Sequence, residues 1–448
     1  MKRIGIALVL LASLVFVGGV QADGTQAPGT WVSSINIQNV GAGEATVLIE
    51  FYNATGALVL SFTVTPPIPA GGSRSLYVPT QITGLPDGQF SAVVSSAQPI
   101  HAVANQSSTG PTTAGAYNGI QAAEAATTLY FPGAYYNYFG FYSELVIQNT
   151  AVATANVKLS FYNDAGALTA SPTDTIPGNA SKVFALKDLG IPAGRYSVEV
   201  VSTNGMSLVG LCNNWTSAKY GEFSDYNAYS GGTTVAYAPS LVNNYYGFVS
   251  SLTVQNIDTT TNADIRVTYS NGVTETVTLA PRTSKEYYQP SNPNLPSGNV
   301  NGIFSAKIES TNGKKIVVLV NQEDKTKGSL ASYNAPSEAS TSINCPVTMK
   351  AFYQWFSAVT VQNVGSVATN ITITFATGQS QTAYNVPANG TYNFVQLASA
   401  GSPLPDGSSV SAVVTAAQPI VAIVNENSDS RYLTTPGDYL CAYTAIAQ

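Results

Sequence analysis

Residues 248–256 read FVSSLTVQN, and close relatives of this nine-residue stretch stand in three other places along the chain. Every copy starts with an aromatic residue, carries serine two positions later and ends in Gln-Asn. The other copies read WVSSINIQN at 31–39, FYSELVIQN at 141–149 and WFSAVTVQN at 355–363, so the motif returns every 107 to 110 residues. A fixed period of this length indicates four tandem modules, each the size of one β-sandwich domain.

Other landmarks recur at matching places in every copy and set the limits of the modules. They are a Pro-x-Gly turn (Pro86, Pro192, Pro296 and Pro405), an asparagine after an apolar strand (Asn105, Asn213, Asn321 and Asn425) and a closing tyrosine (Tyr117, Tyr226, Tyr333 and Tyr443). The chain therefore divides into a leader at 1–22 and repeats at 23–122, 123–231, 232–338 and 339–448.

The modules are predicted to consist of strands, because polar and apolar residues alternate with a period of two. Residues 34–37 read Ser-Ile-Asn-Ile, as expected for a strand with one buried face. Asn-Gly pairs at 204–205 and 312–313 separate apolar runs where a two-residue hairpin turn is expected. The sequence predicts an all-β fold of four tandem Ig-like antiparallel β-sandwich domains, each of about 105 residues and about seven strands, packed end to end.

The first residues predict export. Lys2 and Arg3 precede an apolar run from Ile4 to Val20, and small residues stand before Asp23. This pattern is typical of a secretory signal peptide, so we expect cleavage after residue 22 and a mature protein that is secreted or held at the cell surface. The alternative is an uncleaved membrane anchor, although a run of 17 residues is short for a bilayer span. No later segment is apolar for long enough, so no membrane span is predicted in the mature chain.

Charge and histidine content argue against whole classes of function. Only 9% of the residues are charged and the net charge is −6; without Lys2 and Arg3, 16 basic residues remain against 24 acidic ones, a net charge of −8. An acidic chain offers no basic surface to nucleic acid. His101 is the single histidine, so the commonest general base and metal ligand is nearly missing. The composition predicts a protein that is not an enzyme.

The leader, the tandem modules, the low charge and the S-x-L-x-V-Q-N strand at 250–256 together resemble secreted bacterial surface proteins. Such proteins are built from Ig-like or fibronectin-like repeats, as in S-layer, sheath and filament subunits. The resemblance covers the whole mature chain and implies an exported structural protein that assembles with itself, as a homo-oligomer or polymer, at the cell surface. The alternative is an adhesin or carbohydrate-binding protein whose exposed tyrosines bind surface glycans.

Aromatic residues crowd the beginning of repeats 2, 3 and 4, where one sandwich follows the next. Rings with an apolar body and a polar tip suit an inter-domain contact or a binding surface. Three roles stay open for them: a joint between modules, a contact between subunits, and a stacking platform for glycans. The aromatic residue that opens each nine-residue motif is instead predicted to face a core. The candidate interface residues are Tyr135, Tyr136, Tyr138, Phe139, Tyr245, Tyr246, Phe352 and Tyr353.

Three cysteines occur in a chain that is expected to meet an oxidising environment. Cys345 opens repeat 4 and Cys441 lies in its last strand, so we predict a disulfide between them that stabilises the module by roughly 4 kcal/mol. Cys212 takes the place of an apolar strand residue and is predicted to be a buried free thiol. The alternative is that all three thiols are free.

Cofactor sites are not indicated by any motif. The chain has no cysteine–histidine cluster and no EF-hand loop. Asp164, Asp225 and Asp258 are the carboxylates that calcium would use at module junctions, although solvated turn residues explain such side chains more simply. We predict no cofactor, with calcium as the one candidate.

The two ends of the chain differ in one respect that concerns assembly. Repeats 2, 3 and 4 are each preceded by an extra strand-like run, at 128–132, 234–239 and 342–349. Between the predicted cleavage site and Trp31 only residues 23–30 remain, so repeat 1 is predicted to lack a first strand. Either residues 23–30 fold back as a short edge strand, or the open edge takes a strand from a neighbouring chain.

Overall fold

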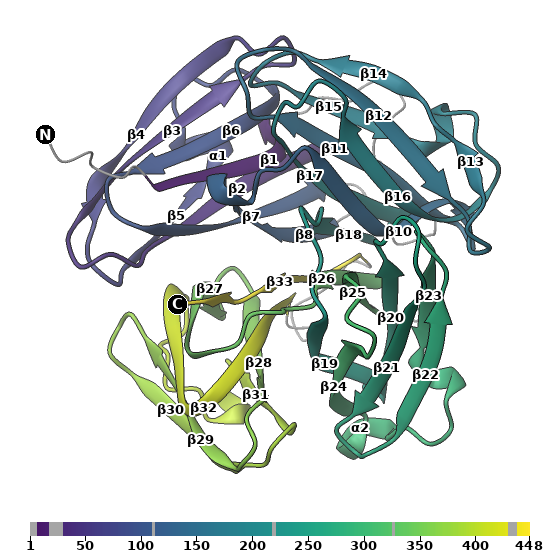
Figure 1. Ribbon diagram of the computed structural model, residues 1–448. Coiled ribbons are helices and arrows are strands. Elements are labelled where there is room, and N and C mark those ends of the chain that lie inside the picture. Colours follow the sequence, from purple (N-terminus) through teal and green to yellow (C-terminus); the bar gives the residue numbers. More distant parts are fainter. Residues whose placement is uncertain (1–6, 18–29, 110–112, 217–220, 325–327, 429–436) are drawn as a thin grey trace, which may run out of the picture.

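The computed structural model describes residues 7–17, 30–109, 113–216, 221–324, 328–428 and 437–448, which form four β-sandwich modules (Figure 1). Strands make up 64% of the chain and helices 5%, and the strands of every sheet are antiparallel. The predicted all-β sandwich fold is confirmed. The modules are numbered 1 to 4 in chain order.

Modules 1 and 2 are each built from eight principal strand positions, one more than predicted. Module 1 comprises β1 (Ala7–Val17), β2 (Thr30–Asn39), β3 (Ala45–Tyr52), β4 (Leu58–Ile68), β5 (Ser73–Tyr77), β6 (Gly88–Ser96), β7 (Ile100–Thr109) and β8 (Thr113–Asn118), and then the short β9 (Ile120–Gln121). Module 2 comprises β10 (Thr128–Tyr138), β11 (Phe141–Asn149), β12 (Ala155–Tyr162), β13 (Leu168–Ala170), β14 (Thr173–Ile176), β15 (Ser181–Ala185), β16 (Gly194–Ser202), β17 (Leu208–Thr216) and β18 (Phe223–Asn227).

Modules 3 and 4 follow the same plan. Module 3 comprises β19 (Val235–Tyr245), β20 (Phe248–Asn256), β21 (Ala263–Tyr269), β22 (Thr274–Leu279), β23 (Ser284–Tyr288), β24 (Ile303–Ser310), β25 (Ile316–Asp324) and β26 (Ser329–Asn334). Module 4 comprises β27 (Ser340–Lys350), β28 (Trp355–Asn363), β29 (Thr369–Phe375), β30 (Ser380–Val386), β31 (Thr391–Val395), β32 (Ser408–Ser428), β33 (Leu440–Thr444) and β34 (Ile446–Ala447).

Helices are few and short, the α-helices of the described residues being α1 (Val78–Gln81) and α2 (Gly298–Asn301). None of the helices seen in the described ranges is long and apolar enough to cross a membrane.

Each module has two layers of strands, with the first strand in one and the last strand in the other. In modules 2 and 3 the pairing of β10 with β11 and of β19 with β20 joins the two layers into one continuous sheet. In module 1 one sheet has the order β4-β3-β6-β1 and the other the order β5-β2-β7-β8. Modules 2 and 3 repeat this order, and in module 4 the long strand β32 serves both sheets by pairing with β27 and β29 in one and with β28 and β33 in the other. The first and last strands therefore lie near the edges of their sheets, where they can meet another strand.

The asparagine of the Gln-Asn motif holds the turn that follows its strand. The Nδ2 group of Asn39 donates to the carbonyl oxygens of Gly43 (2.7 Å) and Ile68 (2.9 Å), and its Oδ1 accepts the N–H of Gly41 (2.9 Å). Asn149, Asn256 and Asn363 make the same set of bonds in their own modules. All four asparagines are buried, so the motif is a framework element that satisfies buried backbone groups.

The four modules close into a ring around their last strands. Each of β8, β18, β26 and β33 contacts the last strands of both neighbouring modules, and Figure 1 shows the modules around this common centre. The expectation of an end-to-end row is therefore wrong. The same contact between one module and the next occurs four times. Each contact rotates the next module by a similar angle, and after four steps module 4 contacts module 1, so the head-to-tail arrangement closes into a ring.

A cycle of hydrogen bonds joins the ends of the last strands. Asn227 donates its N–H to Oδ1 of Asn334 (3.0 Å), which returns a bond from Nδ2 to the carbonyl oxygen of Asn227 (2.7 Å). Asn118 and Thr444 exchange bonds in the same way, at 2.7 and 3.0 Å. Nδ2 of Asn227 then donates to the carbonyl oxygen of Asn118 (2.8 Å), and Oγ1 of Thr444 to that of Asn334 (2.6 Å), so the cycle passes through all four modules.

A second set of four equivalent bonds runs around the ring at its outer side. In each module a buried serine at the same strand position donates to a carbonyl oxygen of the next module. The pairs are Ser91 to Asn179 (2.9 Å), Ser197 to Arg282 (2.6 Å), Ser305 to Asn389 (2.7 Å) and Ser411 to Gly71 (3.1 Å).

The hydrophobic cores of neighbouring modules also touch in rotation. One apolar position on the second-last strand points into the core of the preceding module: Leu211 joins core 1, Leu319 core 2 and Ile423 core 3. Val103 joins core 4 and completes the cycle. All four side chains are fully buried, so the ring is stabilised by apolar burial as well as by hydrogen bonds.

Module 1 has a first strand after all, and the apolar leader supplies it. β1 pairs antiparallel with β6, from Ala7 opposite Ser96 to Val17 opposite Gly88, in the place that β10 holds beside β16. The prediction that repeat 1 lacks this strand is therefore wrong for the whole chain. The alternative in which residues 23–30 fold back lies outside the described residues, apart from Thr30 at the start of β2.

Candidate ligand-binding face

Three hairpin turns at equivalent places carry paired aromatic rings, and we call them the aromatic tips. They connect β10 to β11, β19 to β20 and β27 to β28, and their outermost rings are strongly exposed: Phe139 by 87%, Tyr246 by 61% and Tyr353 by 85%. Each outer ring meets the ring of the preceding residue edge to face. The dyads are Tyr138–Phe139 (centroids 4.7 Å apart, 76° between planes), Tyr245–Tyr246 (4.9 Å, 82°) and Phe352–Tyr353 (4.8 Å, 79°).

The backbone at the aromatic tips is strained in the same way in all three modules. Phe139, Tyr246 and Tyr353 have φ angles of 50°, 51° and 47°, in the left-handed region that aromatic residues rarely adopt. Each such residue costs roughly 1–2 kcal/mol relative to a right-handed conformation. Strained backbone that presents exposed apolar rings is typical of binding sites, because packing alone gains nothing from it.

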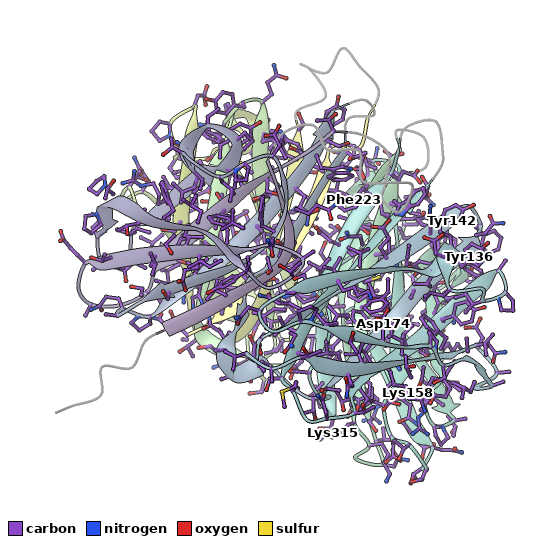
Figure 2. The ribbon with its side chains drawn as sticks, turned by 90° about the horizontal axis from the view of Figure 1, so that it is seen from above. Tyr136, Tyr142, Lys158, Asp174, Phe223 and Lys315 are labelled. Atoms are coloured by element: carbon purple, nitrogen blue, oxygen red, sulfur yellow. The ribbon has the colours of Figure 1, made fainter. Side chains whose placement is uncertain are left out.

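The aromatic tips lie on one face of the ring. Each tip adjoins the outer end of the second-last strand of its module, since Phe141 is paired with Thr216, Val249 with Glu323 and Trp355 with Ser428. Figure 2 shows Tyr136, Tyr142 and Phe223 toward this end of the molecule and Lys158 and Lys315 toward the other. We call the surface formed by the three tips the aromatic face.

A cleft between modules 2 and 3 opens beside the first tip. Its volume is about 320 Å³, and aromatic rings form much of its wall, with carboxylate and amide groups among them. A second cavity of about 540 Å³ shares Tyr138 and Glu286 with the first and is lined by the Arg195 guanidinium. Its wall includes Tyr135, Tyr138, Phe139, Tyr288, Glu286 and Asn321.

Arg195 fixes this junction. The guanidinium is buried, yet it pairs with Asp164 at 2.8 Å and bonds to Oγ of Ser284 at 3.2 Å across the module boundary. The pKa of the Tyr138 hydroxyl is raised, chiefly by burial and then by the Glu286 carboxylate nearby. The cleft thus combines apolar ring faces with fixed polar groups, which is the composition of a small-molecule binding site.

Buried carboxyl groups gather where the four modules meet. Asp438 accepts the N–H groups of Phe223 (2.7 Å), Leu330 (3.1 Å) and Leu440 (3.2 Å), one from each of modules 2, 3 and 4. Burial raises the pKa of Asp225 to about 8 and that of Glu426 to about 7. Asp438 thus joins three modules from inside the ring, and all three carboxyl groups are closed to a ligand because they are buried.

The structure divides the predicted aromatic candidates between two roles. Tyr135 is buried, and its hydroxyl accepts a hydrogen bond from Asn321 of module 3 at 3.2 Å, so it belongs to the joint. Tyr136 is half-buried against Tyr142, whose ring stacks on Trp215. The dyads form the aromatic tips instead: the outer rings of Phe139, Tyr246 and Tyr353 are exposed, and the inner rings of Tyr138, Tyr245 and Phe352 are half-buried beneath them.

Of the aromatic residues that open the nine-residue motif, Trp31 alone is fully in a core. It is 2% exposed and lies on Phe223 of module 2, with 4.6 Å between ring centroids. Phe141, Phe248 and Trp355 are half-buried at the ends of their modules, because the adjoining tip turns the strand toward solvent.

The predicted Cys345–Cys441 disulfide is absent, and all three cysteines are free and buried. The thiol of Cys441 donates instead to Oε2 of Glu426 at 3.4 Å, although both cysteines belong to the core of module 4. Cys345 lies on β27 in the opposite sheet of the module. The expectation that Cys212 is a buried free thiol is confirmed.

All three thiols are therefore expected to be unreactive in the folded protein. Burial raises the pKa of Cys212 and Cys345 to about 12, and that of Cys441 is raised by burial and by Glu426, so almost no thiolate forms at neutral pH. We expect a maleimide reagent to label no thiol in native protein and three in urea, and a reducing agent to leave the melting temperature unchanged. A reductant-dependent fall in melting temperature would contradict the free-thiol arrangement.

The three aspartates considered for calcium lie in separate surroundings. Asp164 pairs with Arg195, Asp225 is buried at the ring centre, and Asp258 accepts the N–H groups of Thr260 and Thr261. Within the described ranges, no group of three or more histidine, cysteine or acidic residues is placed to hold a metal ion.

Sequence reasoning missed several residues of this region. Glu286, Tyr288 and Arg195 come from strands β23 and β16, far along the chain from the tip that they adjoin. One feature of the sequence pointed to Arg195: the chain has only 18 basic residues, and this one stands within a strand. The structure shows that Arg195 is buried.

The fold and the face define an all-β protein of four ring-closed sandwich modules with an exposed aromatic surface. Its sequence matches the model of DUF5719, a family of unknown function, over residues 13–288, so the chain belongs to that family. None of the curated proteins matches it. A solved structure described as "Crystal Structure of Thermotoga maritima 1070" is 22% identical, covers 23% of this chain and 93% of its own, and superposes with a TM-score of 0.21.

Proposed function

We propose that this chain is an exported, non-catalytic surface protein that binds saccharide chains through its aromatic face. The observation that carries the proposal is the repetition of one exposed, strained aromatic dyad in three modules of a closed ring. Because the same strained conformation occurs at three equivalent places, we infer that the three dyads have the same function. The part of each dyad that a ligand can reach is the exposed face of its aromatic ring.

Saccharides fit the chemistry of this face better than other ligands. The faces of a pyranose ring present C–H groups that pack on aromatic rings, while its hydroxyls need donors and acceptors at the rim. Beside the Tyr138–Phe139 dyad the cleft supplies the Glu286 carboxylate and the Asn321 amide. The acidic net charge of −6 disfavours an anionic lipid surface or a nucleic acid as the partner.

The ring gives the three dyads a fixed spacing. Two sets of hydrogen bonds run through all four modules, and neighbouring modules share core residues. The tips are therefore held on a rigid body. A polymer that reaches two tips binds the second one at a high effective concentration. We therefore expect long polysaccharides to bind far more tightly than monosaccharides.

The proposal is tested with a glycan array and with insoluble cell-wall polysaccharide as the probes. Replacing Phe139, Tyr246 and Tyr353 together by asparagine should reduce binding at least a hundredfold, since an exposed aromatic stacking contact contributes roughly 1 kcal/mol or more and the three act together. Asparagine tolerates a positive φ, so the tips should keep their shape.

Tyr384→Asn is the matched control, because Tyr384 is 74% exposed but lies on β30, away from the aromatic face. It should bind like the unchanged protein. The proposal fails if no saccharide binds, if the triple variant binds as well as the control, or if the protein binds lipid vesicles through the same three residues.

Self-assembly as an S-layer, sheath or filament subunit is the second candidate function, and one observation favours it. The contacts between modules are consumed within the ring, so assembly needs another surface. The exposed rings of the aromatic face are such a surface.

A further inference from the structure

The first strand of module 1 differs in origin from those of the other modules. β10 and β19 each insert three buried apolar side chains into their own module core, and β27 inserts four: Leu129, Phe131 and Ala134; Ala236, Ala238 and Leu241; Ile343, Cys345, Val347 and Met349. In module 1 the same place beside β6 is taken by β1, which lies within the run that the sequence predicts to be removed on export.

β1 also fits its place less well than the other first strands do. β10, β19 and β27 each contain a β-bulge, in which three steps along the strand stand opposite two steps along its partner. The bulges lie between Phe131 and Ala134, between Ala238 and Leu241, and between Cys345 and Thr348. In β1 four steps stand opposite two, from Leu11 to Val15.

A proline marks the bulge in modules 2, 3 and 4 but not in module 1. Pro132, Pro239 and Pro346 stand directly after the residue at which the register shifts, where a residue without N–H removes no ladder bond. The corresponding residues of β1, at 12–14, read Ala-Ser-Leu. The leader strand therefore lacks the proline bulge that the first strands of modules 2, 3 and 4 share.

We propose that, once the leader is removed, module 1 presents an open first-strand slot that binds a β-strand of a partner polypeptide. The slot consists of the free edge of β6 and the core side chains Phe90, Ala92 and Val94, which lie on β6 opposite Val15, Leu11 and Val9. The partner strand has apolar residues at alternate positions and a proline after the second of them, as the first strands of modules 2 to 4 have. Backbone hydrogen bonds along β6 give the affinity, and the apolar side chains set the register.

The occupant is a different polypeptide and not a second copy of this chain. Every strand of the described residues already has its place in a sheet. The segment that follows the predicted cleavage site, residues 23–29, reads DGTQAPG and has no alternating apolar pattern. The inference goes beyond saccharide binding, because the slot involves module 1 while the aromatic tips belong to modules 2, 3 and 4.

The experiment uses a chain that begins at Asp23 and, as the probe, a peptide with the sequence of residues 128–138, TLYFPGAYYNY. We expect the peptide to slow hydrogen exchange of the amides at 88–96 at least tenfold and to raise the melting temperature. The chain that begins at Met1 should show neither effect, since β1 fills the slot. A peptide with aspartate at the positions of Leu129 and Phe131 is the control and should not bind.

Three outcomes would overturn the proposal. The amides at 88–96 are already protected in the shortened chain without peptide, the peptide binds both chains equally, or the shortened chain fills the slot by forming oligomers with itself.

A second variant keeps the test informative if the shortened chain fails to fold. In the full chain, residues 7–17 are replaced by the eleven residues of β10, which bring the proline. We expect this graft to unfold at a higher urea concentration than the unchanged chain. An equal or lower midpoint would contradict the claim that the slot is shaped for a proline-containing strand.

Discussion

Asp438→Ala is expected to lower the free energy of unfolding by about 3–6 kcal/mol, because three buried amide groups lose their shared acceptor. Oδ1 of Asp438 accepts the N–H groups of Leu330 and Leu440, and Oδ2 accepts that of Phe223. These donors belong to three different modules, so the loss falls on the closure of the ring. The measurement is urea unfolding followed by tryptophan fluorescence, in which Trp31 reports on the ring centre through its contact with Phe223.

Two variants separate this effect from a general loss of charge. Asp438→Asn keeps one oxygen acceptor and should lose about half as much stability. Asp406→Ala removes an exposed carboxylate that pairs with Lys350 at 3.4 Å, and a pair of this kind contributes at most about 1 kcal/mol. If Asp438→Ala costs no more than Asp406→Ala, the carboxylate does not hold the ring together.

The module plan could be predicted because each repeat satisfies its own sequence pattern. Alternation at period two, the Gln-Asn motif and the Pro-x-Gly turns all act within about a hundred residues, and the strands follow from them. Asn39 illustrates the point, since all of the hydrogen-bond partners of its side chain lie within 29 positions along the chain.

Ring closure was harder to predict, although one signal was present. The second-last strand of several modules reads as a continuous apolar run, as at 208–212, 316–320 and 420–424, instead of alternating. Such a run indicates a strand with both faces buried. The outward-facing members, Leu211, Leu319 and Ile423, are the residues that enter the neighbouring core. The ring closes after four contacts because of the angle through which each module is rotated relative to the previous one. No local sequence pattern determines that angle.

The disulfide prediction was wrong for a related reason. Spacing placed Cys345 in the first strand and Cys441 in the last strand of module 4 correctly, and both thiols lie in one core. Whether two thiols that share a core come within bonding distance depends on how the two sheets pack, which spacing along the chain does not carry.

The stability of the protein is expected to fall as the pH rises from about 5 to 8.5. Burial raises the pKa of Asp225 to about 8 and that of Glu426 to about 7, so both carboxyls are neutral in the folded protein at mildly acidic pH. In the unfolded chain they ionise near pH 4. Between these values the folded state binds more protons than the unfolded state, and stability therefore declines with rising pH.

The size of the decline is on the order of 5 kcal/mol for Asp225, because each unit between the two pKa values corresponds to about 1.4 kcal/mol. His101 acts in the opposite direction: burial lowers its pKa to about 4, so its contribution is lost as the pH falls below 6.5. Burial raises the pKa values of Asp438 and Glu144 as well, so these groups act in the same direction as Asp225 and Glu426. The buried acids together outweigh the single histidine, which places the maximum of stability on the acidic side of neutrality. The measurement is the free energy of unfolding in urea at pH 5, 7 and 8.5.

Asp225→Asn identifies the group responsible. The Asp225 carboxyl lies at the centre of the ring beside the backbone of Gly115 and Ala116 of module 1, and a Cβ on Gly115 would come within 2.7 Å of its Oδ2. An amide keeps one oxygen as a hydrogen-bond acceptor there, and at pH 8.5 it avoids the cost of burying a charge. We expect the variant to be more stable than the unchanged protein at pH 8.5 and about as stable at pH 5, while the exposed control Asp87→Asn keeps the original slope. If the fall of the unfolding free energy with pH persists in Asp225→Asn but disappears in Glu426→Gln, the effect belongs to Glu426, which also binds Asn105 and Cys441. If the unfolding free energy of the unchanged protein does not vary with pH, neither carboxyl is held neutral by the ring.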